Sequence, residues 1–167
     1  MTPRESLAHK DALKSLPAGP VFKPQKKNKL PRPFHKLGGS RIFCTGILTV
    51  SSDHVAMMYW RDGETLTDRS FYGYLMCKLA SGSLSPVFEF HWHPSHKGFH
   101  CKTPCNTDSN YTDRMLPGAP ELDLKTMADA DPAKTQDLAK LVCVFCERCG
   151  ISLSSQDSSQ AQRTLGL

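Results

Sequence analysis

The 167-residue sequence lacks several features that define common classes of protein. No run of apolar residues approaches the roughly 18 that a membrane-spanning helix needs. The first residues, MTPRESLAHKDALKSLP, lack the apolar segment of a secretory signal peptide. The sequence contains no Walker-type phosphate loop, dinucleotide-binding glycine fingerprint, nucleophile elbow or cytidine-deaminase zinc motif. These absences predict a cytoplasmic protein without a membrane partner, outside several large enzyme families.

Acidic residues are absent between Asp11 and Asp53. Five prolines in this interval disfavour a regular helix or a central strand. We therefore expect residues 1–39 to form a basic, largely irregular arm, with a short helix near its start. Its side chains would contact the phosphates of a nucleic acid, RNA rather than DNA, or of another polyanion; a solvated tail is the alternative. The candidate nucleic-acid-binding residues are Lys23, Lys26, Lys27, Lys29, Arg32, Lys36 and Arg41.

Beyond residue 39 the composition changes to that of a packed domain. β-Branched and aromatic residues gather in segments that are separated by turn sequences such as Ser-Ser-Asp and Asp-Gly. Apolar residues at both parities in 54–61 and 70–79 indicate central strands that are covered on both faces, or on one face by a helix. The predicted strands of this region are 41–50, 54–61 and 70–79.

A helix is predicted over residues 133–147, where apolar residues recur at helical spacing. Asp131 is its expected N-cap and Pro132 its first residue. Together with two further strands described below, the order of elements predicts an α+β domain over residues 40–150. Its antiparallel sheet of about five strands would carry the one C-terminal helix on a face. The Ser/Gln-rich tail, 151–167, is expected to be disordered.

Four of the seven histidines fall within ten residues, in the stretch PVFEFHWHPSHKGFHCK (86–102). Apolar and ionisable residues alternate there on both sides of a turn at 94–97, the pattern of two half-buried strands. Joined across a four-residue loop, the strands set apolar against apolar residues and ionisable against ionisable ones. The predicted pairs are Glu89 with Lys102, Phe90 with Cys101, His91 with His100, Trp92 with Phe99 and His93 with Gly98.

The ionisable face of this hairpin is the candidate catalytic surface. Two of its imidazoles would serve as general acid and base and the lysine would stabilise negative charge, as in a metal-independent ribonuclease. The three imidazoles would alternatively bind a transition metal. A polar outer face without chemistry is the third interpretation. The candidate catalytic residues are Glu89, His91, His93, His100 and Lys102.

The sequence HWHPSHKGFH, residues 91–100, resembles segments of small β-rich, RelE-like proteins from bacterial and phage toxin–antitoxin or defence loci. The resemblance implies an RNA-directed toxin or antiviral defence component whose working surface is the histidine face. A protein partner such as an antitoxin or an effector subunit would accompany it. The competing hypothesis is a non-enzymatic interaction protein, an inhibitor or adaptor with a basic arm and structural cysteines and histidines.

The seven cysteines are odd in number and accompany no export signal, which favours reduced thiols over disulfides. Cys143, Cys146 and Cys149 form C-x-x-C-x-x-C, and the last two precede a glycine as in a zinc knuckle. Cys146 and Cys149 together with Cys101 and Cys105 would bind one structural zinc ion, the only cofactor that the sequence suggests. Buried thiols and redox chemistry are the alternatives.

Overall fold

The computed structural model describes residues 3–94, 98–102, 127 and 129–154. A seven-stranded sheet has the strand order β2-β3-β5-β6-β7-β8, and β4 also pairs with β5. Every pairing in it is antiparallel, which confirms the predicted α+β class. The strands are β2 (Lys23–Pro24), β3 (Ile42–Cys44), β4 (Leu48–Thr49), β5 (His54–Arg61), β6 (Ser70–Lys78), β7 (Leu84–His93) and β8 (Gly98–Lys102).

The segment 41–50 forms two short strands rather than the single predicted one. β3 and β4 both pair with β5, and the chain between them bends at Gly46, whose φ of 71° is in the left-handed region. Thr45, between the two strands, still contacts β5, because its hydroxyl accepts a hydrogen bond of 3.0 Å from the backbone N–H of Met58.

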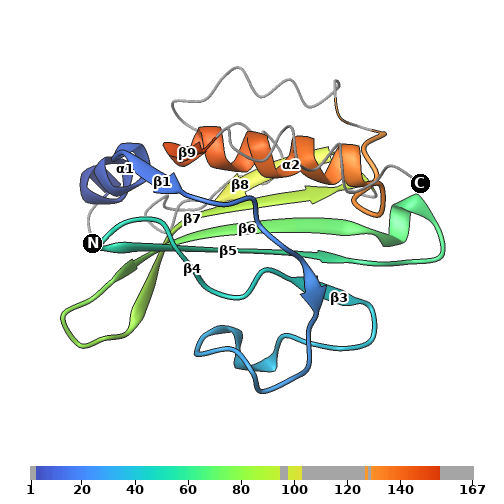
Figure 1. Ribbon diagram of the computed structural model, residues 1–167, viewed down its shortest axis with the longest axis horizontal. Coiled ribbons are helices and arrows are strands. Elements are labelled where there is room, and N and C mark those ends of the chain that lie inside the picture. Colours follow the sequence, from blue (N-terminus) through green and yellow to red (C-terminus); the bar gives the residue numbers. More distant parts are fainter. Residues whose placement is uncertain (1–2, 95–97, 103–126, 128, 155–167) are drawn as a thin grey trace.

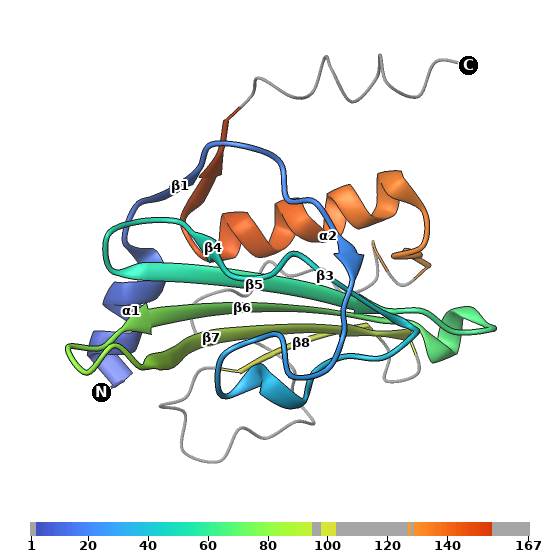
Figure 2. The same ribbon diagram turned by 60° about the horizontal axis from the view of Figure 1, so that its bottom comes forward.

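Helix α2 (Thr135–Arg148) runs along one face of the sheet (Figures 1 and 2). It begins at Thr135 rather than 133, and Lys134 occupies its N-cap position. Asp131 stabilises a separate turn before the helix, where its Oδ1 accepts a hydrogen bond of 3.0 Å from the N–H of Ala133. The helix ends at Arg148, two residues before Gly150, whose φ is 62°.

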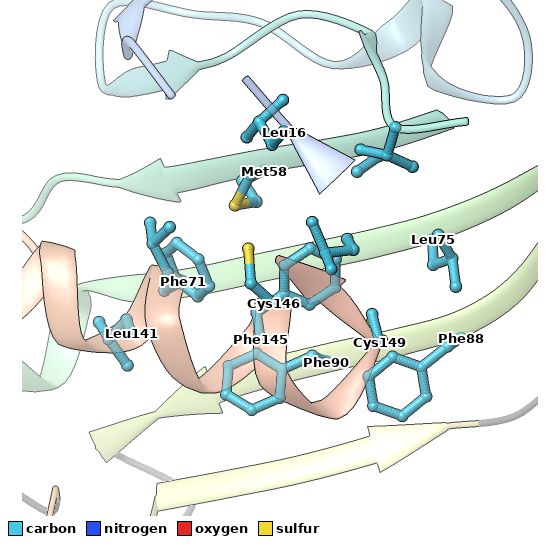
Figure 3. Packing of buried hydrophobic residues seen from close by; sticks show 14 of the residues in the cluster. Leu16, Met58, Phe71, Leu75, Phe88, Phe90, Leu141, Phe145, Cys146 and Cys149 are labelled. Carbon is cyan, nitrogen blue, oxygen red and sulfur yellow. The ribbon is translucent and has the colours of Figure 1, made fainter. Parts of the chain in front are cut away.

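The core lies between α2 and the sheet (Figure 3). Phe145 lies directly over Gly73 of β6, and its ring centroid is 6.2 Å from that of Phe90 and 6.5 Å from that of Phe88. Because Gly73 has no side chain, the phenyl ring packs against the strand backbone. This close approach sets the distance between helix and sheet.

The opposite face of the sheet is covered by part of the basic segment. Leu30, Phe34 and Leu37 pack against a second buried cluster that includes Met57 and Met76. The 3-10 helix η1 (Phe34–Lys36) belongs to this cover, which lies on the other side of the sheet from α2 (Figure 2). The segment therefore differs from the expected extended arm, since three of its apolar side chains complete a core.

A strand near the start of the described chain pairs with a strand at its end. Strand β1 (Lys14–Leu16) pairs in parallel with β9 (Ile151–Leu153), and Leu16 is buried in the main core. The first residues of the tail expected to be disordered thus form a strand; residues 155–167 lie outside the described part.

Helix α1 (Pro3–Asp11) is fastened by two buried polar side chains. Nζ of Lys14 donates hydrogen bonds to the carbonyl oxygens of His9 (2.8 Å) and Lys10 (3.0 Å) at the end of the helix. Nδ1 of His9 lies 3.0 Å from Nε2 of the buried His54 on β5.

The hairpin β7–β8 has the predicted register at all five pairs, including His91 opposite His100. Trp92 is fully buried, and its indole N–H donates a hydrogen bond of 3.1 Å to the carbonyl of Met127. The apolar parity therefore faces α2 and the ionisable parity faces the other way, as predicted. The side chains of His100, Lys102 and Cys101 lie outside the described part of the structure.

Candidate functional site

The sheet face opposite α2 carries a cluster of tyrosine and histidine rings that come from three adjacent strands. Tyr59 lies on β5, Tyr72 and Tyr74 on β6, and His91 and His93 on β7. These five residues are the Tyr–His cluster. The ring of Tyr72 is at its centre, 5.0 Å between centroids from both imidazoles, which are 6.1 Å from each other.

His91 and Glu89 form a largely buried pair within this face. Their side chains are 16% and 18% exposed, and Nε2 of His91 lies 3.3 Å from Oε2 of Glu89. The contact is an ion pair when the imidazole is protonated. A carboxylate in this position orients the imidazole ring.

Tyr59 and Tyr74 are hydrogen-bond donors of the cluster rather than bases. Burial raises the pKa of Tyr59 well above its ordinary value and that of Tyr74 to about 12. Both hydroxyls therefore keep their protons at neutral pH. The ring of Phe34 packs edge-on against Tyr74 at 4.8 Å, so the 3-10 helix η1 covers this end of the cluster.

An open pocket of about 560 Å³ adjoins the other end of the cluster. His93 and Tyr72 form one wall, and Arg41 and Arg61 are among the residues that complete it. Neighbouring strands bring these side chains together, because β3 and β6 both pair with β5 and β7 pairs with β6. We call this the His93 pocket; it is lined further by Asp62, Glu64, Thr67, Asp68, Arg69 and Ser70.

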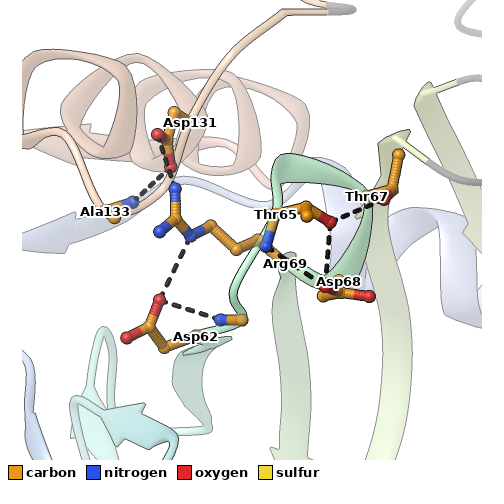
Figure 4. A network of polar contacts seen from close by, with 8 residues as sticks. Asp62, Thr65, Thr67, Asp68, Arg69, Asp131 and Ala133 are labelled. Carbon is orange, nitrogen blue, oxygen red and sulfur yellow. Dashed lines mark hydrogen bonds and ion pairs between the residues drawn. The ribbon is translucent and has the colours of Figure 1, made fainter.

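The arginines of the His93 pocket differ in their ion pairs. Arg69 is held by Asp131 (Nη1–Oδ2, 2.8 Å) and by Asp62 (Nε–Oδ1, 3.1 Å), which joins the η2 loop (Leu66–Asp68) to the turn before α2 (Figure 4). Arg41 lies 3.8 Å from the exposed Glu64, a weak contact in water. Arg61 makes no ion pair with another described residue. Arg41 and Arg61 are thus the cations best able to meet a ligand.

The remaining carboxylate of the pocket, Asp68, is occupied by its own loop. Hydrogen bonds from the hydroxyl and the backbone N–H of Thr65 lower the pKa of Asp68. The carboxylates offset the arginines in formal charge, so the His93 pocket is balanced in charge rather than strongly positive.

The candidate nucleic-acid-binding residues are all exposed. Only Arg41 among them lines the His93 pocket, and Lys36 lies in an adjoining hollow that shares Arg41 and Arg61. Lys23 lines a separate hollow beside β4. Arg61 and Tyr72 were not among the site residues predicted from the sequence. Their positions follow from the pairings of Arg61 with Ile42 and of Tyr72 with His91.

Two cysteines of the predicted zinc site are buried in the core. Burial raises the pKa of Cys146 to about 12, and Cys149 is fully buried beside the β1–β9 pair. Both positions agree with the alternative prediction that these cysteines are buried thiols. Cys143 is exposed. No group of three or more metal-ligating side chains gathers among the described residues. Cys105 and the side chain of Cys101 lie outside them, so the four-cysteine zinc site stays a prediction.

No family model matches this sequence, and no curated protein or solved structure is significantly similar to it. Within the described residues, no helix is both long enough and apolar enough to cross a membrane. The resemblance of residues 91–100 to RelE-like proteins remains an expectation.

Proposed function

We propose that the protein binds single-stranded RNA and cleaves it without a metal ion at the His93 pocket. One observation carries the proposal: an imidazole, a tyrosine and two arginines from four separate segments line one open pocket. Proton transfer, base stacking and phosphate binding are the tasks that these side chains perform in RNA-processing proteins.

Metal-free cleavage requires a base, an acid and a cation. The 2′-hydroxyl oxygen attacks the adjacent phosphorus, the P–O5′ bond breaks, and the products are a 2′,3′-cyclic phosphate and a free 5′-hydroxyl. His93 lines the pocket and accepts the proton of the 2′-hydroxyl. His91, whose ring centroid lies 6.1 Å from that of His93, gives a proton to the departing 5′-oxygen. Arg61 stabilises the negative charge that develops on the phosphoryl oxygens.

The test is cleavage of a fluorogenic oligoribonucleotide by the full chain in the presence of EDTA. We expect His93→Gln and His91→Gln each to lower kcat by at least about 100-fold, the effect of losing one acid/base group. Lys140→Ala, on the exposed face of α2, is the control and should cleave like the wild type. The matching DNA should resist cleavage because it has no 2′-hydroxyl.

Two results would refute this mechanism. Cleavage that EDTA abolishes would show a metal-dependent reaction, and equal activity of His93→Gln and the wild type would remove the histidine from the chemistry. Binding of RNA without any cleavage would favour the alternative, a non-enzymatic inhibitor or adaptor. A toxin or defence component would in addition arrest the growth of a bacterial host, and His93→Gln should relieve that arrest.

A further inference from the structure

A second hollow of about 360 Å³ adjoins the His93 pocket. The two share Arg41 and Arg61, which stand between them. Lys36 adds a third positive charge, and no carboxylate is among the described residues that line the hollow. The hollow is therefore strongly positive, whereas the His93 pocket is balanced in charge. The loop from Lys36 to Ile42, which includes Gly38, Gly39 and Ser40, forms most of the lining of the hollow.

The backbone of this loop is shaped by glycine. Gly38 and Gly39 have φ values of 151° and 154°, and a Cβ on Gly38 would overlap the backbone of Lys27. The carbonyl of Gly39 accepts a hydrogen bond of 3.2 Å from the N–H of Ile42, so Ser40 and Arg41 are the central residues of a turn. The turn hydrogen bond itself does not engage the N–H groups of Ser40 and Arg41. Backbone N–H groups in a turn beside several cations are a recurring means of binding phosphate.

We propose that this hollow, the Lys36 subsite, binds the phosphate next to the one that is cleaved. The inference rests on the proposed RNA function and names its substrate more closely: a single strand that presents consecutive phosphates to the two pockets. Arg41 and Arg61 contact both phosphates because they line both pockets. The exposed Glu64 gives up its 3.8 Å contact with Arg41 to the incoming phosphate.

The test uses calorimetric titration of the full chain with 2′-O-methyl diuridine monophosphate, whose blocked hydroxyl prevents cleavage. Three forms are compared: one without a terminal phosphate, one with a 5′-phosphate and one with a 3′-phosphate. One phosphorylated form should bind about tenfold more tightly than the unphosphorylated one, the effect expected of a charge-assisted contact. Lys36→Ala should abolish that gain, whereas Lys140→Ala should retain it. Thermal melts of both variants check that the fold is intact.

The outcomes separate this subsite from the proposed cleavage. If neither terminal phosphate strengthens binding, or if Lys36→Ala keeps the gain, the subsite is refuted even where the wild type cleaves RNA. If the gain depends on Lys36 but no RNA is cleaved, the subsite stands and the catalytic role of the histidines fails. Loss of the gain in the Lys140→Ala control would also refute the subsite, since it would show an effect of overall charge.

Discussion

Substitution of Gly73 by alanine gives a direct test of how α2 packs on the sheet. A methyl group at this position would lie 2.5 Å from Cδ2 and 2.7 Å from Cγ of Phe145, well inside the contact distance of two carbon atoms. Phe145 is fully buried, with the rings of Phe88 and Phe90 beside it, so it has little room to move. Either the ring or the whole helix must shift, and the core loses contacts elsewhere.

The expected loss follows from two opposing effects. Overpacking a core costs about 1–3 kcal/mol, and replacing a strand glycine by alanine recovers roughly 0.5–1 kcal/mol of backbone entropy. The free energy of unfolding of Gly73→Ala should therefore fall by about 1–2 kcal/mol. For a chain of this length each kcal/mol lowers Tm by roughly 2–4 °C, which predicts a Tm about 5 °C below that of the wild type.

Thermal and urea unfolding followed by circular dichroism measure this change. Gly19→Ala is the matched control, because a Cβ there has no atom within 4 Å, and its Tm should change by less than 2 °C or rise. Gly73→Ala should cost less in a Phe145→Leu background, since the smaller side chain makes room for the methyl group. A Gly73→Ala protein at least as stable as the wild type would refute the close contact of helix and strand.

Three further predictions concern polar side chains. Burial lowers the pKa of His54 from its ordinary 6.5, so the unfolded chain binds the proton more readily than the folded one. The free energy of unfolding should therefore fall as the pH drops below about 6.5, by at most roughly 1.4 kcal/mol per pH unit. His54→Gln should flatten that slope in urea titrations. Arg69→Ala leaves Asp131, 12% exposed, without its charged partner and should cost about 1.5–3 kcal/mol in urea unfolding; a loss under 0.5 kcal/mol would place the pair among weak surface contacts. Lys14→Met removes the hydrogen bonds to the end of α1, and hydrogen exchange should show faster exchange of the α1 amides only; unchanged rates would deny the lysine this role.

The hairpin was predictable because two independent local signals agree. Alternation assigns each residue to a face, and the turn length then sets Trp92 opposite Phe99 and His91 opposite His100. The helix was equally accessible through its apolar spacing, although Asp131 proved to stabilise the preceding turn. Both features depend on residues that are close together in the sequence, so the sequence of one chain is enough to predict them.

The cover on the second face was not predictable in the same way. Leu30, Phe34 and Leu37 are isolated apolar residues among prolines and lysines, without the period of a strand or a helix. The pairing of β1 with β9 joins short segments from opposite ends of the chain, and three residues carry too little pattern to indicate it. Arg61 and Tyr72 could not be predicted as site residues either, because their proximity to His93 depends on the order of four strands in the sheet.

The burial of Glu89 and His91 supports the proton transfer proposed above rather than a solvated polar face. A solvated face would leave both side chains open to water, yet each is more than four-fifths buried. The ring of His91 also packs against those of Tyr72 and Tyr74. Partly burying ionisable groups costs free energy that an apolar pair would not. Val55 and Met57, on the same face of β5, show that apolar side chains fit this side of the sheet. A sequence selected for stability alone would continue that apolar surface across β7; a sequence selected for proton transfer keeps the carboxylate and the imidazole together.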